Sequence, residues 1–377
     1  MRPLYTPNKD HSLGYGGNKI FKPMKKISDY IPISDLKRRV TDIHNNVKFW
    51  ASIIDINHTI NTAAHQYFDG IGSKYVLLPI TTRMISSPGA LYGKEKLDYT
   101  QDTIPVKLKW FDLKKDIFLS ESSQIYLELY LVNRKINSVY SVYNSFRKEK
   151  SDSTHLSEFH HMEYEGKVNQ KTNEKIVLSL VQSMIKRLLK DNLEDLSYFL
   201  FDDDLDYLNR FARSKKVCKL TFEQAMDTLY RVTGEHKYKK ITGSNFGSWE
   251  EVKLSSEFEE IILLENSPLY EVAFYHAPLQ DKGKLVADNA DFIWPYYREF
   301  VGSGHRVRSL KELLIKARKF NLPRADYHNY VLSRRFNDYV ETSGFGLGWE
   351  RFLQGLLKLP YIYLTVPFPR VHSTIYP

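Results

Sequence analysis

The sequence contains very little cysteine and no long apolar stretch, and each lack excludes a class of protein. Cys218 is the only cysteine among 377 residues, so the chain has no internal disulfide and no cysteine-cluster metal site, which is typical of a reducing compartment. No apolar run approaches the roughly 18 residues that span a bilayer, and the first residues lack the apolar core of a signal peptide. We therefore expect a cytoplasmic protein that does not enter a membrane.

Two short motifs of nucleotide and metal sites are also missing. The sequence has no Gly-Lys-Ser/Thr, which excludes a P-loop nucleotide site. It has no His-Glu-x-x-His, and His160 and His161 are neighbours in a predicted strand, where consecutive side chains point to opposite faces. A histidine metal site is therefore not expected.

The composition is that of an ordinary globular protein. With 42% hydrophobic and 26% charged residues, the chain is able to bury a sizeable core. The net charge of +9 suits a polyanion such as nucleic acid, but it suits an ATP-type substrate equally well. Net charge alone therefore does not distinguish a nucleic-acid partner from an ATP-type substrate.

The first part of the chain shows one clear helical pattern. Residues 1–45 are rich in Gly, Pro and Lys and are predicted to form an N-terminal extension. A helix should follow, because Phe49, Ile53, Ile56, Ile60 and Ala64 fall on one stripe at helical spacing. The segment KYVLLPI then predicts a strand that is stopped by its proline.

The rest of the chain alternates between strand and helix patterns, with no internal repeat. Residues 105–165 alternate like strands, and helices are predicted over 174–201 and 220–232. The segments 259–279 and 284–307 return to strand. Residues 333–370 predict a glycine-rich turn, a helix that begins near Trp349, and a final apolar strand.

The stretch SFRKEKSDSTHLSEFHHMEYEG, residues 145–166, predicts two strands joined by a loop. The residues from Lys148 to Thr154 are polar or charged and of the turn-forming kind. The loop should therefore overhang a cavity into which Arg147, Glu149 and Phe159 could point.

Glycine occupies positions 344, 346 and 348, directly before a predicted helix. A lone Gly-x-Gly-x-Gly is weak evidence for a phosphate site, since glycines before a helix more often serve packing. Glu350 and Arg351 follow at once, however, and place an arginine in the first turn of the helix beside an open backbone, which suits an anion. A solvated arginine is the alternative.

These motifs resemble those of class II aminoacyl-tRNA synthetases. Residues 138–165 resemble motif 2, residues 342–370 resemble motif 3, and residues 46–80 resemble motif 1, the usual dimer element. Within the class, SSQIYLELY, SPLYEVAFY, KLVADNADFI and REFVGSGHRV are similar to segments of the asparaginyl and aspartyl enzymes. The resemblance implies an α+β fold, with an antiparallel β-sheet flanked by helices, in one catalytic domain over residues 46–377.

The resemblance also implies an ATP site. Arg147 matches the motif 2 arginine that bridges the α-phosphate and the substrate carboxylate, and Phe159 matches the ring that stacks under adenine with Arg351 of motif 3 above it. Arg147 and Arg351 are thus the expected catalytic residues. The expected ATP-binding residues are Arg147, Glu149, His155, Phe159, Gly346, Gly348 and Arg351.

The same resemblance assigns a metal pair and an amino-acid site. Asp291 and Glu299 match the acidic pair that carries Mg²⁺, a hard cation that prefers carboxylate oxygens. Gln124 and Arg306 match residues that hold the amino acid, and Glu257 falls where a further active-site acid occurs. Each residue also has an ordinary structural interpretation: a solvated acid, an ion pair that stabilises the sheet, or, for Phe159, a core ring.

Four departures from the family pattern bear on function. Asparaginyl enzymes carry Arg-His-Leu where this chain has Thr154-His155-Leu156, so an arginine for the γ-phosphate is missing, with His155 or Lys150 as possible substitutes. Leu127 replaces a lysine that aspartyl enzymes use for the side-chain carboxylate, which disfavours strict aspartyl chemistry. The segment ISSPGALYG lacks the glutamate that the family often uses near the α-amino group. About 45 residues precede motif 1, too few for the anticodon-binding barrel.

From these features we expect an ATP-dependent ligase that activates an asparagine-like or aspartate-like acid as an aminoacyl-adenylate, with ATP and Mg²⁺, in a homodimer. The acyl group would pass to ammonia, an amine or another small acceptor. One alternative is a truncated tRNA ligase that charges an acceptor stem without reading the anticodon. Another is a non-catalytic module that binds nucleotide or a partner.

Overall fold

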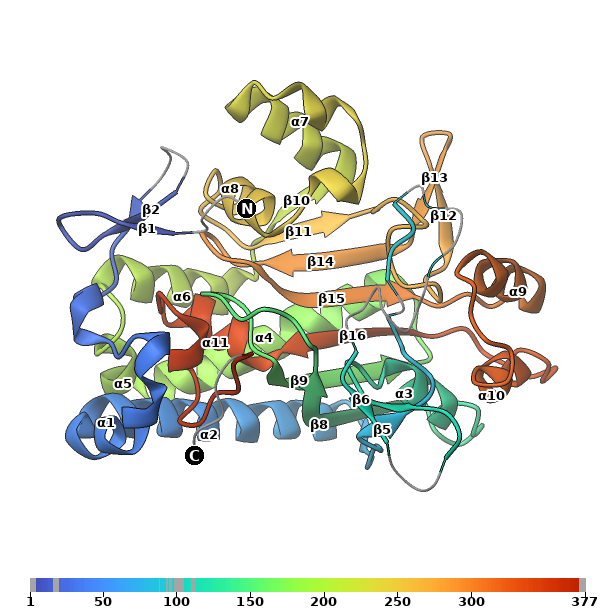
Figure 1. Cartoon of the computed structure of the whole chain (residues 1–377), viewed down its shortest axis with the longest axis horizontal. Helices are drawn as coiled ribbons and strands as arrows, with labels where there is room; N and C mark the ends of the chain where they lie inside the picture. The colour runs from blue at the N-terminus through green and yellow to red at the C-terminus, as the bar shows by residue number, and fades with distance from the viewer. Residues whose placement is uncertain are drawn as a thin grey trace.

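A computed structural model describes residues 5–15, 20–87, 89–92, 94, 97, 105–109 and 113–372 (Figure 1). Its centre is an eight-stranded sheet in the order β10-β11-β14-β15-β16-β9-β8-β4. The strands are β4 (Lys74–Tyr75), β8 (Ser138–Phe146), β9 (Glu158–Gly166), β10 (Cys218–Thr221), β11 (Ile262–Glu265), β14 (Asn289–Ile293), β15 (Glu299–His305) and β16 (Ser343–Gly348). Neighbours from β11 to β8 pair antiparallel, and the two outer strands β10 and β4 pair parallel.

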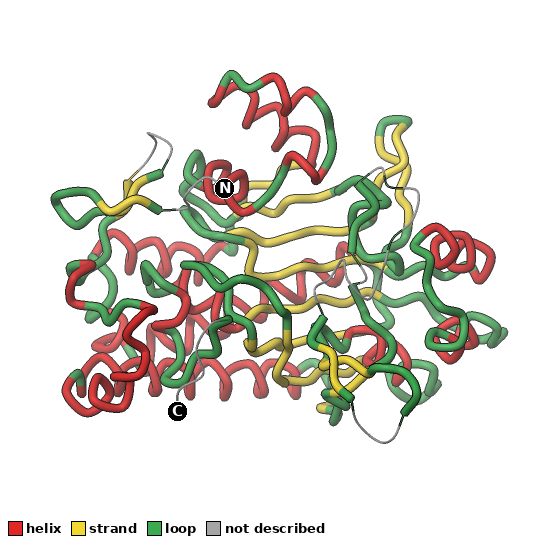
Figure 2. Tube along the Cα trace, viewed as in Figure 1, coloured by secondary structure: helices red, strands yellow, loops and turns green. Residues whose placement is uncertain are grey.

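Two long helices, α2 (Val47–Gly70) and α4 (Gln170–Asp191), pack against each other beside the sheet (Figures 1 and 2). The stripe predicted on α2 is buried, with each of its five side chains 4% exposed or less. It joins the main hydrophobic core, to which α4 adds Val177 and Leu180. The helical spacing at 49–64 therefore predicted both the element and its buried face.

Shorter elements surround this core, and each occupies a small part of the chain. They are β1 (Thr6–Pro7), β2 (Leu13–Gly14), β3 (Ile20–Phe21), α1 (Arg39–Asn45), β5 (Thr81–Thr82), β6 (Lys107–Leu108), β7 (Ile117–Leu119), α3 (Gln124–Tyr130), α5 (Leu193–Ser197), α6 (Asp202–Ser214), α7 (Phe222–Thr233), α8 (Ser248–Ser255), β12 (Pro278–Asp281), β13 (Lys284–Ala287), α9 (Leu310–Lys319), α10 (His328–Ser333) and α11 (Trp349–Leu356). Among the described residues, no helix combines the length and the apolar composition needed to cross a membrane.

The N-terminal segment packs on the rest of the molecule. The Tyr5 hydroxyl donates to the carbonyl of Tyr296 at 2.7 Å, and the Tyr363 hydroxyl donates to the carbonyl of Ile31 at 3.0 Å. Arg39 is buried and donates to the carbonyl of Tyr363 at 3.1 Å. These contacts tie Tyr5 to the β14–β15 connection, and Ile31 and Arg39 to the C-terminal segment.

Three local predictions were wrong. Residues 124–130 form helix α3 rather than a strand, and their buried positions Gln124, Ile125, Leu127 and Glu128 follow helical spacing. The predicted glycine turn is the strand β16. The predicted final strand is largely irregular, with a short 3-10 helix at Ile362–Leu364. In a short run of apolar residues, the spacing typical of a strand and that typical of a helix are hard to tell apart, and the burial pattern in the structure decides between them.

Candidate active site

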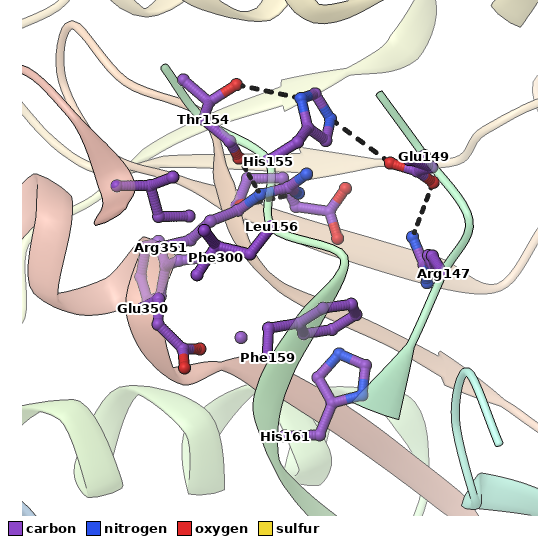
Figure 3. Close-up of a pocket in the computed structure, with 14 residues that line it drawn as sticks. Arg147, Glu149, Thr154, His155, Leu156, Phe159, His161, Phe300, Glu350 and Arg351 are labelled. Atoms are coloured by element: carbon purple, nitrogen blue, oxygen red, sulfur yellow. Dashed lines mark hydrogen bonds and ion pairs between the residues drawn. The ribbon is translucent and has the colours of Figure 1, made fainter. Parts of the chain in front are cut away.

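A cavity lies on the face of the sheet opposite the core. Met162 and Tyr164 of β9 and Phe345 and Leu347 of β16 belong to the core. Side chains alternate along a strand, so the odd-numbered residues of β9 and the even-numbered residues of β16 share the other face. The cavity forms there, between the loop at 147–157, the start of β15 and helix α11 (Figure 3).

The structure brings the predicted ATP-binding residues together in this cavity. The predicted residues that line it are Arg147, Glu149, His155, Phe159, Gly346, Gly348, Arg351 and Glu299 of the predicted metal pair. Sequence reasoning missed other lining residues, namely Thr154, Leu156, His161, Phe300, Glu350 and Ile362. The odd-even alternation of β9 was a usable signal for His161, which follows Phe159 on the same face.

Glycines leave the floor of the cavity bare. Gly344 and Gly346 of β16 pair with Gly304 and Gly302 of β15, so four glycines lie side by side on two strands. A Cβ at Gly344 would collide with the Glu165 carboxylate and the Tyr164 carbonyl. The nearest atom would be 3.3 Å away at Gly346 and 3.9 Å away at Gly348. Glycine is therefore sterically required at 344. A Cβ at Gly346 would crowd the Glu163 carboxylate, whereas one at Gly348 would make only ordinary van der Waals contacts.

Phe159 and Arg147 form the part of the cavity nearest to β8. The guanidinium carbon of Arg147 lies 5.6 Å from the centroid of the Phe159 ring, and one of its nitrogens is 3.8 Å from Glu149 Oε1. His161 meets Phe159 edge-on at 4.9 Å and shares a 2.8 Å hydrogen bond with Ser145 Oγ. Burial, with Arg147 and Arg351 nearby, lowers the pKa of His161 to about 3, so its ring is neutral.

Arg351 projects from the first turn of α11 toward the opposite wall. Its guanidinium donates to the backbone carbonyls of Glu299 at 3.3 Å and Thr154 at 3.4 Å. Burial, and then the neighbouring Arg298, lower the pKa of Arg351 to about 10, which still leaves it charged at neutral pH. Its hydrogen-bond acceptors are carbonyls rather than carboxylates, so its positive charge is available to an anion.

Arg298 lies next to Thr154, the position at which asparaginyl enzymes carry the arginine for the γ-phosphate. It donates to Thr154 Oγ1 at 3.2 Å and to His155 Nε2 at 3.1 Å, and it forms a bidentate ion pair with Glu251. The other ring nitrogen, His155 Nδ1, is 2.9 Å from Asp152 Oδ1. Burial lowers the pKa of His155. In this arrangement His155 Nε2 accepts a hydrogen bond and is unable to donate one to a phosphate.

Asp291 and Glu299, the predicted metal pair, lie on neighbouring strands with their carboxylates close together. A Cβ at Gly302 would be 2.9 Å from Glu299 Oε1 and 3.7 Å from Asp291 Oδ1. Burial raises the pKa of both acids, and repulsion from Glu299 adds to the rise at Asp291. Two such carboxylates at the edge of a polar cavity fit a divalent cation that keeps several water ligands.

Two of the residues predicted to bind the amino-acid substrate, Gln124 and Arg306, both contact Glu165. The amide nitrogen of Gln124 donates to Glu165 Oε2 at 2.5 Å, and Arg306 Nη2 donates to the same oxygen at 2.8 Å. Glu257 is not among them, because it pairs with Lys253 at 2.7 Å. On helix α8, which ends before Glu257, Glu251 pairs with Arg298 and accepts a hydrogen bond from the backbone nitrogen of Glu299 at 3.0 Å.

The fold and this cavity define a class II aminoacyl-tRNA synthetase. The chain belongs to that class, because residues 33–372 match the family described as "tRNA synthetases class II (D, K and N)". It is an ATP-dependent ligase, as predicted from the sequence. The predicted sheet flanked by helices is also confirmed. The roles of individual residues stay predictions.

Several of the similar proteins are asparagine enzymes. An asparagine--tRNA ligase of Thermococcus gammatolerans is 30% identical over 357 residues, which cover 93% of this chain and 77% of that protein. That of Pyrococcus abyssi is 30% identical over 331 residues, covering 87% and 70%. The asparaginyl-tRNA synthetase of Pyrococcus horikoshii, in complex with asparaginyl-adenylate, superposes with a TM-score of 0.78 and 27% identity over 95% of this chain and 79% of that one.

The carboxylate pair generates a prediction about stability. We expect Glu299→Gln to raise the unfolding temperature measured without Mg²⁺ by about 2–4 °C, the shift that ~1 kcal/mol produces in mid-sized domains, because one of two repelling charges is removed. Mg²⁺ should stabilise the wild type and leave the variant unchanged. Calorimetry at neutral pH measures both, with Glu174→Gln on α4 as the control for neutralising a buried acid. The same response to Mg²⁺ in wild type and Glu299→Gln would exclude a metal role for Glu299.

Proposed function

We propose that this protein activates the carboxylate of asparagine, or of a closely related acid such as aspartate, by forming an aminoacyl-adenylate from ATP. The observation that carries the proposal is the convergence of Arg147, Phe159 and Arg351 over a glycine floor in one cavity. The name of the Pyrococcus horikoshii structure, which holds asparaginyl-adenylate, supports the same chemistry. The asparagine enzymes among the relatives support the substrate class.

In the proposed reaction, an oxygen of the substrate carboxylate attacks the α-phosphorus of ATP. A new bond forms between that oxygen and phosphorus, the bond from phosphorus to the bridging oxygen breaks, and pyrophosphate leaves. Negative charge builds on the phosphoryl oxygens in the transition state, where fixed cations are most effective. Arg147 is the cation closest to the Phe159 ring on which adenine would stack, and Arg351 faces it from α11.

Asp291 and Glu299 would hold the Mg²⁺ that neutralises phosphate charge in this reaction. We assign the γ-phosphate to Arg351 rather than to His155, because His155 Nε2 already accepts a hydrogen bond from Arg298. Arg298 itself is held by Glu251. Of Arg298 and Arg351, it is therefore Arg351 whose positive charge is available to a phosphate.

The acyl acceptor is the part of the function on which sequence and relatives differ. The sequence predicts a small acceptor such as ammonia or an amine. The names of the relatives specify tRNA, and the net charge of +9 suits a polyanion. We therefore propose tRNA as the first candidate and a small amine as the second. Both fit a cytoplasmic protein, in agreement with the single cysteine.

A homodimer is part of the proposal. Residues 46–80, which resemble the usual dimer element, expose apolar side chains that a monomer would leave in water. They are Val47, Ile54, Ile71, Tyr75, Leu77 and Ile80, with Leu77 the most exposed at 79%. A two-fold interface would bury the same patch on both copies.

Removing the motif 2 arginine should stop activation. We expect Arg147→Ala to slow asparagine-dependent exchange of pyrophosphate into ATP by about a hundredfold or more, the effect of losing roughly 3 kcal/mol of transition-state stabilisation. The fold should survive, since Arg147 and Glu149 are both partly exposed. Arg187→Ala, on α4, is the matched control because Arg187 is also a partly exposed arginine in an ion pair. Near-normal exchange by Arg147→Ala would remove this residue from the reaction.

The acceptor is tested by offering tRNA and amines in parallel. With ATP, Mg²⁺ and radiolabelled asparagine or aspartate, we expect the label to appear in tRNA as a base-labile ester, because the relatives that carry the proposal are tRNA ligases. Separate reactions contain ammonium or methylamine and are analysed for the amide. Label that enters only the amide would establish the small-acceptor function that the sequence predicts.

The dimer is tested by sedimentation equilibrium at micromolar concentration. We expect the wild type to have twice the mass of one chain, and Leu77→Glu to sediment as a monomer, since a charge would be buried without a partner. Glu223→Gln changes an exposed residue far along the chain and should leave the mass unchanged. A monomeric wild type would contradict the proposed interface.

A further inference from the structure

A three-stranded sheet near the start of the chain packs against the segment that leads into the active site. Its strands pair in the order β1-β2-β3, and we call residues 5–15 and 20–21, which carry them, the N-terminal arm. Leu13, Tyr15 and Phe21 of the arm are buried, and Leu13 and Phe21 belong to the main core. The arm lies outside residues 33–372, which match the synthetase family, so the family assignment gives it no role.

The arm contacts the turn between β14 and β15. The Tyr5 hydroxyl donates to the carbonyl of Tyr296 at 2.7 Å, and the rings of Tyr5 and Phe21 lie 5.9 and 5.2 Å from that of Tyr297, centroid to centroid. Tyr296 has a φ of 68°, in the left-handed region that bulky residues rarely adopt. Such a conformation persists only where the surrounding structure holds it. The arm supplies that hold just before Arg298.

The arm also holds helix α8, which lies beside it (Figure 1). The Tyr15 hydroxyl donates to the carbonyl of Val252, the residue that follows Glu251. At the end of α8, Ser255 Oγ donates to the carbonyl of Tyr297 at 3.0 Å, which joins the helix to the turn. The arm therefore contacts both segments, α8 and the turn, that carry the two partners of one buried ion pair.

That ion pair, Glu251 with Arg298, connects the arm to the cavity. Both side chains are buried and the pair is bidentate. Arg298 donates to Thr154 and His155 in the loop over the cavity, and Glu251 accepts from the backbone nitrogen of Glu299. Thr154, His155 and Glu299 all line the cavity. A shift of the ion pair would therefore move the loop and one acid of the predicted metal pair together.

We propose that the N-terminal arm is a positioning element for nucleotide binding, in which Tyr5 and Tyr15 hold the Glu251–Arg298 pair and, through it, the loop over the cavity. Neither tyrosine is among the residues that line the cavity, so both act through other residues. We expect no effect on the amino acid, because two of the residues predicted to bind it are held by Glu165, at the end of β9 that is farther from the loop. The inference rests on the proposed function for the identity of the nucleotide.

The kinetic test removes the two hydroxyl groups and keeps the rings. In asparagine-dependent exchange of pyrophosphate into ATP, we expect Tyr5→Phe and Tyr15→Phe each to raise the KM for ATP by about 2–10-fold, the effect of losing one hydrogen bond, and to leave the KM for asparagine unchanged. The matched control is Tyr67→Phe, which removes a 3.2 Å hydrogen bond from a hydroxyl on α2 to the carbonyl of Ile176 on α4. It should leave both KM values unchanged.

Hydrogen exchange of the full chain without ATP tests the positioning itself. In the double variant Tyr5→Phe/Tyr15→Phe, we expect the backbone amides of residues 147–157 and of α8 to exchange about tenfold faster than in the wild type, because their local opening becomes easier. The amides of α2 and α4 should exchange at the wild-type rate. Tyr67→Phe should leave the amides of the loop and of α8 unchanged.

Each outcome decides the inference. Wild-type exchange rates in residues 147–157 of the double variant overturn it, as does equal acceleration throughout the protein, which would show that the arm only stabilises the fold. An equal rise of both KM values overturns it as well. If the double variant does not fold, the two single variants are compared in the same way and decide. A wild type without pyrophosphate exchange would contradict the proposed function, whereas the hydrogen-exchange result would still decide whether the arm positions the loop.

Discussion

The constraint on which this structure depends is the close approach of buried side chains to the paired glycines of β15 and β16. A Cβ at Gly344 would collide with the Glu165 carboxylate of the neighbouring strand β9, and one at Gly304 would collide with the ring of His276. The opposite face carries the large core residues that pack toward α2 and α4. One face of the sheet therefore stabilises the fold. On the other face, glycine makes room for buried polar side chains at Gly304 and Gly344, and Gly346 and Gly348 line the cavity.

The charged side chains around the cavity are only partly compensated by partners within the protein. Arg351 donates to carbonyls, Asp291 and Glu299 repel each other, and Glu121 and Glu163 each retain an unpartnered oxygen. By contrast, Arg298 with Glu251 and Arg306 with Glu165 form closed ion pairs that set the shape of the walls. The proposed function assigns an anion to the uncompensated arginine and a divalent cation to the carboxylate pair. If both bind as proposed, they would restore stability that the protein without ligands gives up.

The sequence predicted the class of fold and most of the residues that line the cavity through its resemblance to the class II synthetase motifs, and its local periodicity predicted the α2 stripe and the motif 2 strands. It failed where local pattern is ambiguous or contacts are distant. The alternation at Gln124–Tyr130 suited a strand as well as the helix that forms. The contact of Arg298 with Thr154 joins residues 144 positions apart and follows an irregular register at Phe292 and Ile293, which no local signal reveals.

The central claim is that a carboxylate attacks the α-phosphorus of ATP in this cavity, and an isotope experiment tests it most directly. The enzyme is given ATP, Mg²⁺ and asparagine whose carboxylate oxygens are heavy isotopes, and the nucleotide products are analysed by mass spectrometry. Acyl transfer from an adenylate breaks the carbon–oxygen bond, so the account predicts AMP that has gained one heavy oxygen. Unlabelled AMP, or ADP with labelled phosphate, would show a different route of activation and contradict it.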